Sequence, residues 1–164
     1  MIVKHSQAPL AYVRSPWEDK VEAACSSWGG TPYKLNKCLQ GRYVDCLHFA
    51  AAVLDLLFGA SHSKNLQSLP PDACVHNRRG VESALRALLR AYPQTRIQDG
   101  TVEAGDLVVW GRRTQKSGPS HILVASTKSK LWHATPPAVA FCGYSVPDSH
   151  RLLAVYRSKH KHLW

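Results

Sequence analysis

A cysteine stands at the start of an almost wholly apolar segment, directly after an aspartate. The stretch from Tyr43 to Gly59 reads YVDCLHFAAAVLDLLFG, which places Cys46 in the first turn of an expected helix and Asp45 just before it. A thiol in this position meets the positive end of the helix dipole and backbone N–H groups that lack helical partners, and both lower the pKa of the thiol. The sequence therefore predicts that Cys46 is a nucleophile.

Two histidines in the second half of the chain have the chemistry that such a thiol needs. His121 opens one strand-like segment, and His133 lies near the end of the next. If these strands form an antiparallel hairpin, the two rings approach each other at one edge of the sheet, where the helix N-terminus can pack. One imidazole would then relay the proton, and the other would orient it. Cys46, His121 and His133 are a candidate triad; the alternative is a buried apolar cysteine with structural histidines.

Helical patterns dominate the first half of the chain. Residues 17–28 carry apolar side chains at helical spacing, with acidic residues in the first turn. Residues 46–58 contain no glycine or proline and are closed by Gly59, which favours a central buried helix. An amphipathic helix is expected over residues 81–92, and Pro93 directly after it should end the helix.

Strand patterns dominate the second half. Residues 29–45 and 60–80 are rich in glycine, proline and polar side chains and are expected to be loops. Short segments rich in β-branched and aromatic residues follow, at 106–110, 121–127, 130–134 and 151–157. Helices followed by strands indicate an α+β fold with an antiparallel sheet.

The composition is that of one globular domain. The chain has 164 residues, of which 45% are hydrophobic and 20% are charged, which is sufficient to bury a core. No internal repeat or low-complexity linker divides it. We expect a single domain over residues 1–164, with a core at about residues 17–157 and a basic tail at 158–164.

The charge of the chain is strongly positive. Lysine and arginine outnumber aspartate and glutamate by 21 to 11, which gives a formal net charge of +10. Such a charge favours an anionic partner such as nucleic acid, a membrane surface or an acidic cell-wall polymer. The basic residues are scattered, and aromatic residues do not interleave with them as on a base-stacking surface. A solvated basic face is the simpler interpretation, and no specific binding of nucleic acid is expected.

The cysteines and the N-terminal residues indicate which cofactors and which cellular location to expect. The five cysteines are odd in number and include no CxxC pair, so neither a metal site nor another cofactor is expected. The N-terminal stretch has no apolar core of the length that a signal peptide needs, and no window approaches a membrane span. We therefore expect synthesis in the cytoplasm without an export signal.

The order of the motifs resembles that of a known family. GTPY, VDC, GDLVVW, HILVAS and LWHA follow one another between Trp17 and Arg157. In content and order they resemble the NlpC-type cell-wall peptidases, a branch of the papain-like cysteine enzymes. DCLHFAAAVLDLLFG and GPSHILVAS are most similar to the small peptidases of phage tails and gene transfer agents. The resemblance implies a papain-like domain in which a central helix packs on an antiparallel sheet.

The same resemblance implies a role for each site residue. Cys46 would attack an amide carbonyl, His121 would take and return the proton, and His133 would fix the ring of His121. Tyr33 would lie near the oxyanion, and Asp45 would bind a free amine of the substrate. The backbone N–H of Cys46 is a second oxyanion donor, because first-turn amides lack helical partners. Two alternatives stay open: Asp45 caps the helix, and Tyr33 packs in the core with its hydroxyl at the surface.

Some positions depart from the family pattern. Many relatives have Ser-Gly after the cysteine, whereas this chain has Leu47 and His48. His48 is two positions after Cys46 and should lie on another helix face, so it is expected to be a packing or surface residue. KLNKCLQGRY follows Tyr33 where relatives tend to have two glycines, and Cys38 in this segment is either an incidental or a regulatory thiol.

Three other residues are expected to be structural. Trp110 and Trp132 should pack on a sheet face, and Asp106 should belong to a turn that leads into a strand. No catalytic role is therefore expected for these three residues.

The resemblance implies a cysteine hydrolase that cleaves an amide in the peptide stem of peptidoglycan, at the bond between D-glutamate and the diamino acid, through a thioester. The expected partners are the stem peptide and proteins of a phage-tail-like particle, with action at the cell wall, in the periplasm. Other candidates are a different thiol amidase or acyltransferase on the same fold, and a non-catalytic tail or assembly component. A protein that binds nucleic acid through its charge is a further candidate, for which no motif is present.

Overall fold

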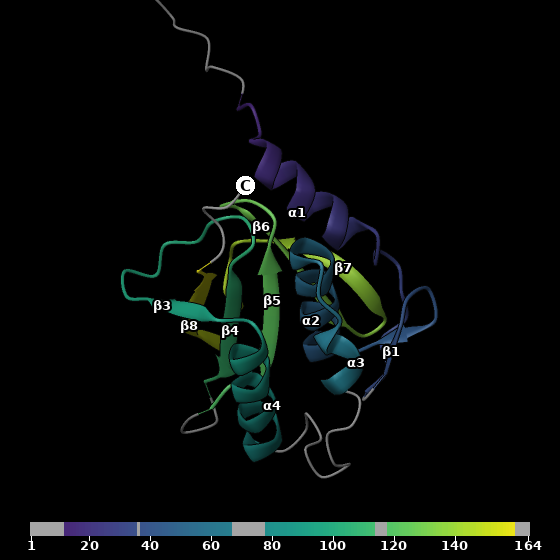
Figure 1. The fold of residues 1–164 in the computed structure, drawn as a ribbon. Helices are drawn as coiled ribbons and strands as arrows, with labels where there is room; N and C mark the ends of the chain where they lie inside the picture. The colour runs from purple at the N-terminus through teal and green to yellow at the C-terminus, as the bar shows by residue number, and fades with distance from the viewer. Residues whose placement is uncertain (1–11, 36, 67–77, 114–117, 160–164) are drawn as a thin grey trace, which may run out of the picture.

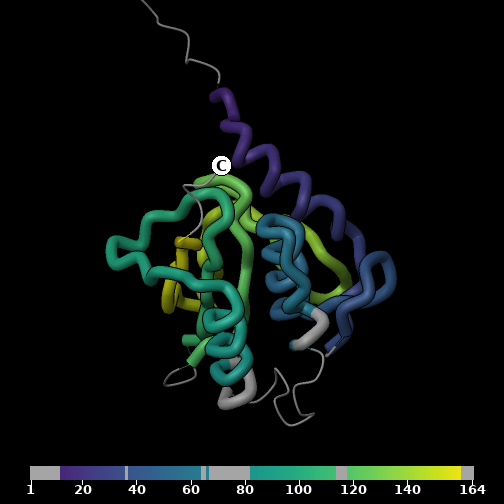
Figure 2. Tube along the Cα trace, in the orientation of Figure 1, coloured from purple at the N-terminus to yellow at the C-terminus, as the bar shows by residue number. Residues whose placement is uncertain are grey.

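The computed structural model describes residues 12–35, 37–66, 78–113 and 118–159 (Figure 1). The helices of this part of the chain are α1 (Pro16–Ser26), α2 (Cys46–Phe58), α3 (His62–Leu66) and α4 (Arg78–Ala91). The strands are β1 (Cys38–Leu39), β2 (Tyr43–Val44), β3 (Gln94–Ile97), β4 (Leu107–Arg112), β5 (His121–Ala125), β6 (Lys130–Thr135), β7 (Ala138–Gly143) and β8 (His150–Ser158). The path of the chain through them can be followed in Figure 2.

Local capping explains where the first two helices begin and end. The Ser15 side chain accepts a hydrogen bond from the Glu18 N–H at 3.2 Å, and the Glu18 carboxylate accepts one from the Ser15 N–H at 2.8 Å, which forms a capping box on α1. Asp45 is the N-cap of α2, and Gly59 ends α2 with a left-handed φ of 65°. The first two turns of α2 are wholly buried, so this helix lies at the centre of the fold.

A curled antiparallel sheet supports the helices. Its order is β3-β8-β4-β5-β6-β7, so β8 lies between β3 and β4. Neighbouring strands are antiparallel throughout, and the register between β4 and β8 shifts between Val109 and Trp110. The helices α2 and α4 lie on one side of this sheet (Figure 1). β1 and β2 form a separate hairpin that leads into α2.

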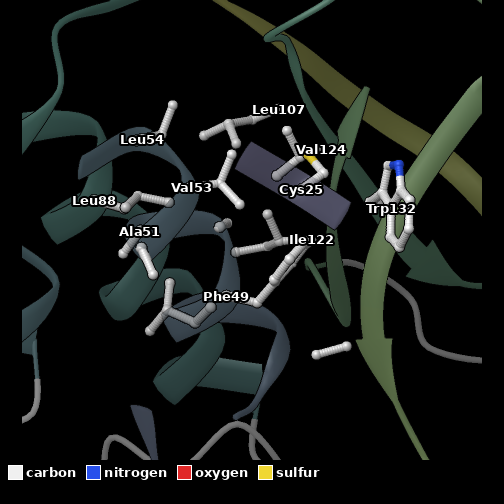
Figure 3. Close-up of a cluster of buried hydrophobic side chains, with 14 of the residues drawn as sticks. Cys25, Phe49, Ala51, Val53, Leu54, Leu88, Leu107, Ile122, Val124 and Trp132 are labelled. Atoms are coloured by element: carbon white, nitrogen blue, oxygen red, sulfur yellow. The ribbon is translucent and has the colours of Figure 1, made fainter. Parts of the chain in front are cut away.

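Side chains alternate across the sheet and form two hydrophobic clusters. Ile122 and Val124 of β5 face the helices and belong to one cluster with Phe49 of α2 (Figure 3). Leu123 of the same strand belongs to a smaller cluster with Trp110 on the other face. The larger cluster therefore fixes α2 against β5.

Most of the long elements agree with the sequence-based expectations. The helices expected over 17–28, 46–58 and 81–92 are α1, α2 and α4, although α4 begins at Arg78. The expected strands are β4, β5, β6 and β8. The α+β organisation with an antiparallel sheet is confirmed.

The two expected loops are wrong in part. Residues 29–45 contain β1 and β2, and residues 60–80 contain α3 and the start of α4. These elements are too short to show a hydrophobic period, and β3 and β7 were missed as well. Cys74 and the end of the basic tail, residues 160–164, lie outside the described residues. Within the described ranges, no helix is both long and apolar enough to cross a membrane.

Candidate active site

The two histidines of the predicted triad are in contact. Nε2 of His121 lies 2.8 Å from Nδ1 of His133. β5 and β6 are antiparallel neighbours that pair with Val124 opposite Trp132 and Ala125 opposite Leu131, and His121 and His133 come from these two strands. The expectation that the two rings meet at the sheet edge is confirmed.

Burial keeps both imidazoles neutral at neutral pH. It lowers the pKa of His121 to about 3, with smaller contributions from His133 and His150. It also lowers the pKa of His133. The indole ring of Trp110 lies beside His121, with a distance of 6.3 Å between the ring centroids. A neutral imidazole carries one N–H and one lone pair, so in the tautomer whose Nε2–H donates to His133, His121 can accept a proton at Nδ1.

The Cys46 thiol lies against the first residues of β5. The side chain is buried, and burial raises the pKa of the thiol to about 12, with a further rise from the Asp45 carboxylate. Hydrogen bonds from the backbone N–H groups of Ile122, Leu47 and Cys46 itself lower the pKa, but by less. The expectation of a lowered pKa is therefore wrong for this state of the protein, because burial outweighs the effect of the helix terminus. Since Ile122 follows His121, these contacts also place the thiol next to the histidine-bearing end of β5.

The Asp45 side chain caps the helix that it precedes, α2. Its side chain is fully buried, and Oδ1 accepts a hydrogen bond from the His48 backbone N–H at 2.9 Å. Nδ1 of the His48 ring lies 2.9 Å from both carboxylate oxygens. The alternative that Asp45 caps α2 is confirmed.

His48 is a buried polar partner of the site and not a surface residue. Only 3% of it is exposed, and its ring is paired with Asp45. The spacing of His48 from Cys46 did not predict this contact, whereas its spacing from Asp45 does. The signal was present, because an N-cap residue and the residue three positions later are neighbours in a first turn.

Tyr33 lies beside the strand that leads into the nucleophile. It forms a parallel bridge with Val44, and its N–H donates to the Pro137 carbonyl at 2.9 Å. Its half-buried side chain packs against the helix-side hydrophobic cluster. The structure therefore places Tyr33 near the segment of Asp45 and Cys46, and its part in oxyanion binding stays a prediction.

Cys38 lies close to the first turn of α2. Its half-buried sulfur lies 3.9 Å from the backbone carbonyl oxygen of His48. This contact places a second thiol beside the loop that lines the site, but it assigns no role to that thiol.

The residues expected to be structural have structural contacts. Trp110 and Trp132 are buried on the sheet, as predicted. Asp106 lies in the turn before β4, where its N–H donates to the Glu103 carbonyl at 3.1 Å. Its carboxylate also accepts hydrogen bonds from the Arg157 guanidinium, the nearest at 2.8 Å, which the sequence did not reveal.

A hollow of about 470 Å³ lies between α4 and the strands β3, β4 and β8, beside the segment that leads into His121. Its lining combines charged and apolar side chains, among them Glu82, Arg86, Arg96, Pro119, Leu153 and Tyr156. In the described part of the chain, no group of three or more histidine, cysteine or acidic residues is arranged to hold a metal ion.

Comparison with known proteins supports the fold alone. No family model matches the sequence, and a search of the curated proteins found no match. Among solved structures, the fold is similar to that of a Staphylococcus aureus protein described as "similar to lipoprotein, NLP/P60 family". The TM-score is 0.57 at 17% sequence identity, and the match covers 95% of this chain and 46% of that chain, so this chain spans less than half of that protein's length. The chain thus has the fold seen in a solved protein of the NLP/P60 family.

Proposed function

We propose that this protein is a thiol hydrolase that cleaves an amide bond in the peptide stem of peptidoglycan. The observation that carries the proposal is the paired His121 and His133 at the end of β5 against which the Cys46 thiol lies. The fold similarity to an NLP/P60-family protein supports a cell-wall peptidase. The motif resemblance favours the bond between D-glutamate and the diamino acid.

The mechanism starts from a neutral thiol and a neutral imidazole. As the Cys46 sulfur attacks the amide carbonyl, its proton passes to Nδ1 of His121, and His133 holds the ring through Nε2. The oxyanion accepts hydrogen bonds from the Cys46 backbone N–H and from Tyr33. His121 then gives its proton to the leaving amine, which departs and leaves a thioester. Water, deprotonated by His121, hydrolyses the thioester and restores the thiol. No step uses a metal or an organic cofactor.

The hollow lined by Pro119, in the segment that leads into His121, is the candidate binding surface for the stem peptide, although none of Cys46, His121 and His133 lines it. It contains Arg96 together with the ion pair of Arg86 and Glu82, which suits a ligand that carries a carboxylate group. The net charge of +10 would favour approach to an anionic wall polymer. We also propose delivery by a phage-tail-like particle to the cell wall, which the motif resemblance supports.

The test compares the purified protein with its Cys46→Ala variant on muropeptides of known structure. Mass spectrometry of the products identifies the bond that is cut. Cleavage by the wild type alone supports the thiol hydrolase. Products cut between sugar and peptide indicate an amidase of the same fold instead. If a control peptidase cleaves the muropeptides and this protein does not, the proposal fails.

One observation favours a second candidate, a non-catalytic component of a tail or assembly complex. The raised pKa of the buried Cys46 thiol is what an unreactive structural cysteine would have. In that case Cys46 should react with an alkylating agent no faster than Cys38 or Cys142, both of which are more exposed. Faster reaction of Cys46 in the presence of a bound stem peptide would exclude this candidate.

A further inference from the structure

The carboxylate that precedes the nucleophile already has a hydrogen-bonding partner within the protein. Both oxygens of Asp45 lie 2.9 Å from Nδ1 of His48, and Oδ1 also accepts the His48 backbone N–H. Asp45 has no exposed surface, and His48 has 3%. A carboxylate in this position could bind a substrate ammonium group only if it gave up the imidazole.

The exchange would be unfavourable for both partners. If the imidazole left the carboxylate, Nδ1 of His48 would become a second buried polar atom without a partner, because Nε2 already has none among the described residues. The substrate amine would also have to lose its water to reach a fully buried carboxylate. The expectation that Asp45 binds a free amine therefore conflicts with the geometry of this chain.

We propose that His48 takes the place of a substrate ammonium group on Asp45, so that the enzyme acts on stem peptides whose amino end is acylated. This inference rests on the proposed function. An acylated amino end is neutral, and it is the form in which a stem is attached to its sugar in the intact polymer. His48 is thus a specificity-determining residue that acts through Asp45. Enzymes that bind the free amine would instead favour stems already released from the sugar.

The test uses two forms of one synthetic stem tripeptide, L-alanyl-γ-D-glutamyl-diaminopimelate with a free amine and the same peptide N-acetylated. The values of kcat/KM are compared for the wild type. We expect the acetylated peptide to be cleaved at least as efficiently as the free one. Preference for the free amine by more than about tenfold, the factor expected of a retained contact between ammonium and carboxylate, would overturn the inference.

Three variants separate specificity from folding. His48→Ala exposes one side of the Asp45 carboxylate and should shift the ratio of kcat/KM toward the free-amine peptide. His48→Asn keeps a side-chain N–H donor and should hold the wild-type ratio. His62→Ala removes a histidine of α3 that packs on the ring of Tyr92, away from the described site, and serves as the control. Circular dichroism and thermal melting establish whether each variant is folded. If His48→Ala does not fold, the ratio of kcat/KM for the two peptides in the wild type alone tests the inference.

The possible outcomes separate this inference from the function on which it rests. If the wild type cleaves neither peptide while a control peptidase cleaves both, the proposed function fails and the inference falls with it. If the wild type cleaves both peptides and prefers the free amine by more than about tenfold, the function stands and the inference alone fails. An unchanged ratio in a folded His48→Ala variant would also overturn it.

Discussion

Nε2 of His121 faces Nδ1 of His133 at 2.8 Å, so Nδ1 is the nitrogen of His121 that this contact leaves available. The pair therefore fixes the orientation of the His121 ring. Since the two residues lie on adjacent strands, the backbone pairing of β5 and β6 sets their separation.

Removal of the orienting ring should impair catalysis without unfolding the protein. We expect His133→Ala to lower kcat about 100-fold or more, because His121 would lose the partner that orients its ring. His133→Asn, which can still accept a hydrogen bond from Nε2–H, should retain more activity than His133→Ala. Muropeptide cleavage rates and thermal melts of the three proteins provide the measurement. An unchanged kcat in folded His133→Ala would contradict the role.

Reaction of the free enzyme with a thiol reagent should depend steeply on pH. Burial raises the pKa of the Cys46 thiol to about 12, from an ordinary value of 9.0, so little thiolate is present at neutral pH. The rate of alkylation by iodoacetamide should rise about tenfold per pH unit between about pH 7 and pH 10. The modified cysteine is identified by peptide mass, with Cys46→Ala as the reference. A rate that is constant above about pH 6, as a preformed thiolate gives, would be inconsistent with this buried thiol.

Acid should destabilise the fold through His121. Burial lowers its folded-state pKa to about 3, from an ordinary value of 6.5, so the unfolded chain binds a proton that the folded protein does not. This contribution to stability is present above about pH 6.5 and is lost as the pH falls toward 3, at up to about 1.4 kcal/mol per pH unit.

The effect can be measured by urea unfolding of the wild type and of His121→Gln at about pH 6.5 and pH 4.5. The variant, which has no titrating group at this position, should lose less free energy of unfolding between the two pH values. Equal losses in the two proteins would show that His121 is not the group responsible.

Two ion pairs of different burial should differ in their contribution to stability. Asp106 is fully buried and paired with Arg157, so Asp106→Asn should lower the free energy of unfolding by about 3 kcal/mol. Glu82 and Arg86 form an exposed pair on α4, so Glu82→Gln should change the free energy of unfolding by less than about 1 kcal/mol. Urea unfolding of both variants tests this, and equal effects would contradict the assignment.

The long elements could be predicted because their residues carry local signals. α2 is apolar and ends at Gly59, and β5 opens with His121 and continues with branched residues. β3 has the sequence QTRI and no regular alternation between buried and exposed side chains, so nothing local distinguishes it from a loop. Its pairing with β8 is a long-range contact that depends on the rest of the sheet.

The site could be predicted in part for the same reason. The approach of His121 and His133 follows from their places at the ends of two neighbouring strands. The pKa of the Cys46 thiol could not be predicted, because it depends on how completely the folded chain excludes water from the sulfur. The pairing of His48 with Asp45 could be predicted from their spacing of three residues across the first turn of α2.

The position of β8 has a consequence for the order of assembly during synthesis. Within the described residues, β3 is bonded to the sheet through β8, which is made more than fifty residues later. Until residue 158 has left the ribosome, β8 cannot pair fully. β3 then lacks its partner strand, and one edge of β4 is open to other chains. The sheet is therefore completed only after β8 is made, and until then the edge of β4 that β8 covers stays open.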